Sequence, residues 1–136
     1  MIDIKLLEQL CLCNGISGDE GNVRNLIINE IKDCADDIKT DNLGNLIVFK
    51  KGKKSAKSKL MVSAHMDEVG LMVTDITSDG YLKFDEVGGI DRRVLPGKRV
   101  CVGSNGLNGV IGVKPIHLTN GDEKTAVPKM NDMYID

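Results

Sequence analysis

Aromatic side chains are scarce in this chain of 136 residues: they make up 3% of it, and tryptophan is absent. Few rings argue against a base-stacking platform and against a carbohydrate cleft lined with aromatic residues. An excess of charge of one sign is lacking too, because 18 basic and 20 acidic residues leave a formal net charge of −2. Such a balance gives no electrostatic argument for nucleic acid as a partner.

Long apolar runs are also missing, and no segment reaches the roughly 18 uncharged apolar residues of a membrane span. The apolar N-terminal stretch contains Asp3 and Glu8, whereas a signal peptide has a basic start and an uninterrupted apolar core. No two of the four cysteines form a Cys-x-x-Cys pair, so a zinc ribbon is not expected. We therefore expect a cytoplasmic protein with reduced thiols and no membrane partner.

The first third of the chain has helical periodicity. Apolar residues predict a helix over 3–13, and Asp3 stands where an N-cap is expected. A second amphipathic pattern predicts a helix over 18–35. Ser17 and Glu20 have the spacing of a capping box at its start, in which each side chain accepts from the other residue's backbone N–H.

Strand-like apolar runs follow at 45–49 and 59–64, and residues 41–45 form a predicted turn before the first of them. Six lysines crowd into residues 50–59. A phosphate or nucleic-acid patch is one interpretation of this segment. A solvated loop between the two strands is the simpler one, because no aromatic residue or glycine-rich cradle accompanies the lysines.

From Val69 onward the pattern changes to short strands separated by glycine turns. Residues 69–76 and 81–89 predict a hairpin around Ser78-Asp79-Gly80, and closely spaced turn signals continue to the end of the chain. This rhythm is typical of a small β-barrel or sandwich. We therefore predict an α/β protein with an α/β part over residues 1–68 and a β-rich part over residues 69–136.

The candidate site is the segment around His65, where a predicted strand ends. Residues i and i+2 of an extended chain face the same way, so Asp67 is expected beside the His65 imidazole. A carboxylate on one ring nitrogen fixes the tautomer and leaves the other nitrogen for a metal. Glu68 faces the opposite way and is expected to be structural. A histidine satisfied by a neighbouring carboxylate, without any metal, would show the same His-x-Asp spacing.

Several separated blocks of the sequence resemble one family of enzymes, and they occur in the family's order. The chain is similar to the N-terminal portion of the glutamyl aminopeptidase and tetrahedral aminopeptidase family. The resemblance rests on NGISGDEGNVR (14–24), TDNLGNLI (40–47), SAHMDEVGLMV (63–73), FDEVGGIDRRVLPGKRV (84–100), GVIGVKPIHL (109–118) and MYID (133–136).

The resemblance implies an α/β metallopeptidase-type catalytic domain followed by a small β-barrel-like, dimerisation-type domain inserted into it. It also implies a dinuclear-metal aminopeptidase that removes N-terminal residues from peptides with two divalent metals, zinc or cobalt, and that assembles into oligomers. His65 then corresponds to a metal ligand, and Asp67 to the catalytic-site carboxylate that orients it. Relatives labelled as endoglucanases imply a further, weaker alternative.

The chain also departs from the family, whose members are longer and carry the remaining ligands and the general base beyond the matched portion. His117 does not match the distal histidine ligand, and we expect it to be a structural or surface residue. We therefore expect a fragment, a split product or a truncated chain that is inactive alone, binds metal weakly and self-associates. The alternatives are a non-catalytic remnant or assembly module and, more weakly, a binding protein that acts through residues 50–59.

Overall fold

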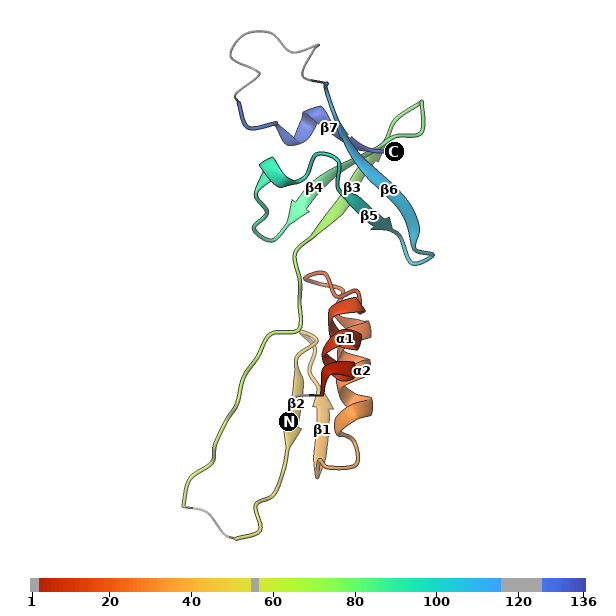
Figure 1. Ribbon diagram of the computed structural model, residues 1–136. Helices are drawn as coiled ribbons and strands as arrows, with labels where there is room; N and C mark the ends of the chain where they lie inside the picture. The colour runs from red at the N-terminus through yellow and green to blue at the C-terminus, as the bar shows by residue number, and fades with distance from the viewer. Residues whose placement is uncertain (1–2, 55–56, 116–125) are drawn as a thin grey trace. The chain divides into compact units, whose positions relative to one another are not determined.

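The computed structural model describes residues 3–54, 57–115 and 126–136. It is a mixed α/β fold, as predicted, and it divides into two compact units, Met1–Glu68 and Val69–Asp136. Helices and a two-stranded sheet make up the first unit, and a larger sheet makes up the second (Figure 1). No helix in the described ranges is long and apolar enough to cross a membrane.

Helix α1 (Ile4–Leu12) begins where the sequence predicts it. Asp3 caps the helix, because its Oδ1 accepts from the backbone N–H groups of Lys5 at 3.0 Å and Leu6 at 3.2 Å. None of the residues of α1 is buried, and the Ile4 side chain is 76% exposed. The apolar face of this helix is therefore largely uncovered within its own unit.

Helix α2 (Gly21–Ile31) is shorter than the predicted range of 18–35. Before it, Gly18 takes a φ of +92°, and the Asp19 N–H donates to the Ile16 carbonyl at 2.8 Å. This turn uses residues that the sequence assigns to the helix, so the first helical residue is Gly21. On the buried side of α2, Val23 is 7% exposed.

Strands β1 (Asp37–Thr40) and β2 (Leu46–Phe49) form an antiparallel pair. The predicted turn joins them: Asp41 Oδ1 accepts from the backbone N–H groups of Leu43 and Asn45, both at 2.9 Å. Arg24 of α2 also donates from Nη1 to the Gly44 carbonyl at 2.9 Å. These bonds attach the hairpin turn to the helix.

The strand predicted over 59–64 is not formed, and this prediction is wrong for the described residues. Residues 59–67 have no regular secondary structure, and Leu60 and Val62 are 92% and 87% exposed. A segment becomes a strand only by pairing its backbone with a neighbour. Among the described residues β2 pairs with β1 alone, so this segment makes no ladder with the free edge of β2.

The second unit contains one antiparallel sheet in the order β3-β4-β7-β6-β5. Its elements are β3 (Gly70–Ile76), β4 (Leu82–Val87), the short helix η1 (Arg92–Val94), β5 (Arg99–Val102), β6 (Leu107–Val113), the short helix η4 (Met130–Asp132) and β7 (Met133–Ile135). The predicted hairpin of 69–89 is confirmed as the β3–β4 pair. In the described part of the chain no pairing joins β3 to β5, and a barrel-like closure stays a prediction for the complete protein.

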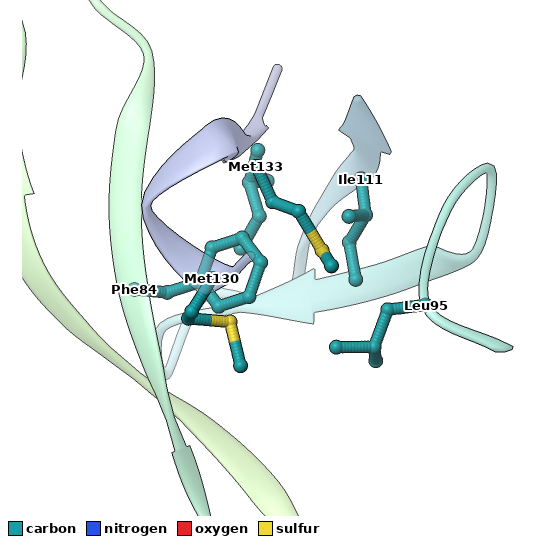
Figure 2. Close-up of a cluster of buried hydrophobic side chains, with 6 residues drawn as sticks. Phe84, Leu95, Ile111, Met130 and Met133 are labelled. Atoms are coloured by element: carbon teal, nitrogen blue, oxygen red, sulfur yellow. The ribbon is translucent and has the colours of Figure 1, made fainter. Parts of the chain in front are cut away.

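The main hydrophobic core lies in this second unit, where Phe84, Leu95, Ile111, Met130 and Met133 converge (Figure 2). Met133 is fully buried, and Ile111 is 1% exposed. Both lie on the central strands β7 and β6, so the last strand of the sequence occupies the middle of the sheet. The first unit has a single buried hydrophobic side chain among its described residues, Val23.

Candidate functional site

The structure brings His65 and Asp67 together, as the spacing predicts. His65 Nδ1 lies 2.9 Å from Asp67 Oδ1 and 3.0 Å from the Asp67 carbonyl oxygen. The His65 side chain is 85% exposed, and that of Asp67 is 39% exposed. The prediction that a strand end carries His65 is wrong, because residues 61–67 form no strand. The pair is held instead by contacts with the loop that precedes α2.

Ser17 is the partner that the sequence analysis missed. Its hydroxyl donates to Asp67 Oδ2, fifty residues away in the chain. The predicted capping box is therefore absent: Ser17 does not cap α2, and Glu20 Oε1 accepts from the Gly18 N–H at 2.6 Å. Hydrogen bonds from Ser17 first, and from His65 second, lower the pKa of the Asp67 carboxyl below its ordinary value. A serine in a capping pattern gives no sign of so distant an acceptor.

A backbone clamp holds this loop against the candidate site. The Glu68 N–H donates to the Gly15 carbonyl at 2.7 Å, and the Ser17 N–H donates to the Glu68 carbonyl at 3.4 Å. Glu68 Oε1 also accepts from the Gly15 N–H at 3.2 Å, so its side chain is used structurally. The clamp includes a parallel bridge between Ile16 and Glu68. It fixes the separation between the Ser17 hydroxyl and the Asp67 carboxylate.

His65 and Asp67 line a groove of about 670 Å³ in the first unit. One wall is β2 with the turn before it, and the other is the extended segment from Met61 to Asp67. Leu46, Ile47 and Val48 contribute apolar surface to the first wall. The imidazole therefore borders a recess that is large enough for an additional segment of chain or a small ligand.

The described residues contain no group of three or more His, Cys, Asp or Glu side chains placed to hold a metal ion. His65 is a single potential ligand, with Asp67 on its other ring nitrogen. His117, which the sequence predicts to be structural or at the surface, lies outside the described residues. Lysines 50, 51, 53, 54, 57 and 59 lie in irregular chain, and Lys50 pairs with Asp36 at 3.9 Å.

Comparison with known proteins identifies the family. The M42 glutamyl aminopeptidase family model matches residues 44–136. The chain belongs to this family. It is 39% identical over 121 residues to the lysyl aminopeptidase of Pyrococcus furiosus, which covers 87% of this chain and 34% of that protein. The chain spans little more than a third of the length of the curated relatives that it matches.

Solved structures with the same fold agree with this assignment. The Pyrococcus horikoshii TET1 peptidase, which can assemble into a tetrahedron or a large octahedral shell, matches with a TM-score of 0.80 and 45% identity. That match covers 98% of this chain and 39% of the other. A Thermotoga maritima structure described as an endoglucanase gives the same TM-score and identity, over 96% of this chain and 37% of its own.

Proposed function

We propose that this chain is the part of a dinuclear-metal aminopeptidase that supplies one metal ligand, His65, and its orienting carboxylate, Asp67. The complete enzyme would remove N-terminal residues from peptides in the cytoplasm. The observation that carries the proposal is the occupied Nδ1 of His65, because Asp67 on that nitrogen leaves Nε2 for a metal. Membership of the family supports the proposal, because a curated relative is a lysyl aminopeptidase.

The residues present fit one ligand of a metal centre and no more. A catalytic zinc ion normally takes three protein ligands, and the described residues hold no cluster of that size. The remaining ligands and the general base would come from the length of the relatives that this chain does not span. When bound, zinc or cobalt would polarise the peptide carbonyl and lower the pKa of its water. We therefore expect the chain alone to be inactive and to bind metal weakly.

Self-association of the complete protein is part of the same proposal. The second unit contains the main core and would be the small, barrel-like module through which subunits assemble. The ability of the Pyrococcus horikoshii relative to build closed shells supports this assignment. A non-catalytic assembly role for the chain by itself is the second candidate. It is favoured by the second unit, which contains a buried hydrophobic core, whereas the first unit buries little more than Val23 among its described residues.

An endoglucanase activity has less support. Glycosidases work with two carboxyl groups on either side of the scissile bond. In the candidate site, the Asp67 carboxylate already accepts from Ser17, and the Glu68 carboxylate accepts from the Gly15 N–H. These bonds give both groups local positioning roles.

A chimera tests the proposal. We would replace the matched segment of the Pyrococcus furiosus lysyl aminopeptidase with this chain and assay lysyl-, leucyl- and glutamyl-p-nitroanilide. We expect an active chimera, loss of activity in His65→Ala, and retained activity in the matched control His117→Ala. An active chimera that tolerates His65→Ala would contradict the assignment of the ligand.

Metal titration of the 136-residue chain adds an independent test. We expect weak zinc binding that disappears in His65→Ala, because a single histidine with one positioned partner makes an incomplete site. Tight, stoichiometric binding that His65→Ala leaves unchanged would show that the metal site lies elsewhere.

A further inference from the structure

Three side chains from two distant segments of the first unit form a short hydrogen-bonded chain. The Ser17 hydroxyl donates to Asp67 Oδ2, and Asp67 Oδ1 lies 2.9 Å from His65 Nδ1. The two carboxylate oxygens thus have separate partners, one on each side. Ser17 therefore sets the orientation of the carboxylate through Oδ2, the oxygen that His65 does not contact.

The direction of these bonds fixes where the imidazole proton lies. Two oxygens face His65 Nδ1, the Asp67 carboxylate and the Asp67 carbonyl at 3.0 Å, and both can only accept. The neutral imidazole therefore carries its proton on Nδ1, and its lone pair lies on Nε2. A carboxylate free to rotate about its terminal bond would hold Nδ1–H less tightly, because its two oxygens would exchange places.

The Ser17 hydroxyl is not needed to hold its own loop. Backbone hydrogen bonds of Gly15 and Ser17 with Glu68 already fix that loop. Helix α2 begins without a side-chain cap, although a serine at this end typically stabilises a helix by capping it. The hydroxyl is therefore directed away from the nearest helix terminus and toward the carboxylate next to His65.

We infer that Ser17 is a positioning residue of the metal site, which locks the Asp67 carboxylate so that His65 presents Nε2. This inference rests on the proposed role of His65 as a metal ligand. It adds a member to the site from the loop between α1 and α2, fifty residues before Asp67 in the chain. The hydroxyl acts through the Asp67 carboxylate, to which it donates.

The test is the tautomer of His65 in the metal-free 136-residue chain, read from its two imidazole ¹⁵N chemical shifts at a pH where the ring is neutral. A His117→Gln background leaves one imidazole to observe. We expect the Nδ1–H form in the parent chain and in Ser17→Thr, which keeps the hydroxyl. Ser17→Val, which has the shape of threonine without the hydroxyl, is expected to show a mixture of tautomers. Ser104→Ala removes an exposed hydroxyl in the second unit and is expected to change nothing.

The parent chain decides the inference even where a variant fails to fold, since a dominant Nε2–H tautomer there overturns it. An unchanged Nδ1–H tautomer in folded Ser17→Val overturns it as well. Zinc affinity gives a second readout: loss of an outer partner of a metal-binding histidine typically weakens binding by about 10- to 100-fold. A tautomer that depends on Ser17, together with an active chimera that tolerates His65→Ala, would contradict the proposed function and leave the positioning role standing.

Discussion

Gly15 lies where the loop before α2 passes closest to the helix itself. A Cβ added at this position would lie 2.5 Å from Val23 Cγ2 and 3.4 Å from the Met66 carbonyl oxygen. Val23 is buried and cannot move away without opening the packing of α2. The absence of a side chain at Gly15 therefore allows the clamp with Glu68 to form, and that clamp places Ser17 beside Asp67.

Gly15→Ala is expected to destabilise the first unit by about 1–3 kcal/mol, the usual cost of overpacking a close contact. The helical far-UV signal during urea unfolding measures the effect, because both α-helices of the described chain lie in this unit. Gly21→Ala is the matched control: its Cβ would meet nothing closer than Arg24 Nη2 at 3.8 Å. Equal free energies of unfolding for the two variants would show that the loop at Gly15 shifts to make room for the added Cβ without a measurable cost.

Asp91 supplies a prediction on pH dependence. The Arg93 guanidinium donates to both carboxylate oxygens of Asp91. Nε lies 2.9 Å from Oδ1, and Nη2 lies 2.6 Å from Oδ2. The hydrogen bonds and charge of Arg93 lower the pKa of Asp91 to about 2. Because the folded-state pKa lies below the ordinary value of 3.8, the carboxylate stabilises the fold fully above 3.8. This contribution is lost as the pH falls through about 2.

The carboxyl ¹³C shift of Asp91, followed through an acid titration, checks this expectation. In Arg93→Gln the midpoint should move up toward 3.8, because the guanidinium that stabilises the charged form is gone. A midpoint of Asp91 that does not respond to Arg93→Gln would show that the pair is not formed in solution.

At the scale of elements, β7 decides whether the second unit folds. It has three residues, yet it lies between β4 and β6 and contributes Met133 and Ile135 to the core. The short helix η4 brings Met130 to the same cluster, and Lys83 of β4 donates from Nζ to the Asn131 and Met133 carbonyls at 2.9 and 3.2 Å. The sheet therefore depends on a strand that joins it last in the sequence.

Met133→Ala is expected to destabilise the second unit by about 2–5 kcal/mol, through lost burial and the cavity that remains. Met72→Ala on β3 is the matched control, because Met72 is 61% exposed and its loss should cost little. Tyrosine fluorescence reports on this unit, since the chain's two tyrosines, Tyr81 and Tyr134, lie there in a tilted pair with ring centroids 4.8 Å apart. The unfolding midpoint of the first unit, followed by its helical far-UV signal, should shift far less. A single transition with the same midpoint in both signals would contradict the expectation that the two units unfold independently.

At the scale of the whole molecule, the two units differ in how much core they have. The second buries six hydrophobic side chains in one cluster, whereas the first buries Val23. Strand β2 has one neighbour in the described chain, and Ile47 and Phe49 are 55% and 51% exposed on it. Exposed apolar surface beside a free strand edge favours pairing with another chain.

We accordingly expect the 136-residue chain to self-associate at micromolar concentration, as sedimentation velocity would show. Ile47→Lys places a charge on the free edge of the first unit and should shift the chain toward monomer. Met72→Lys makes the same change on β3, an end strand of the second sheet, and the pair of variants separates the two routes of association. A monomeric parent chain with cooperative unfolding would refute the expectation.

The sequence by itself determined the features that depend on neighbouring residues. The Asp3 cap, the turn at Asp41 and the β3–β4 hairpin form because their donors, acceptors and glycines lie within a few positions of one another. The contact of His65 with Asp67 belongs to this group, since two residues of extended chain suffice to bring them together. The order of its blocks also identified the family.

Tertiary structure decided the features that depend on distant partners. The hydroxyl of Ser17 could cap the helix that follows it or reach a carboxylate fifty residues away, and the clamp between Gly15 and Glu68 selects the second. The apolar run at 59–64 has the composition of a strand, yet in the described chain it pairs with no neighbour and stays irregular. Local sequence fixes which groups are available, and the fold settles which partners they reach, because long-range hydrogen bonds form only where packing has already placed both ends.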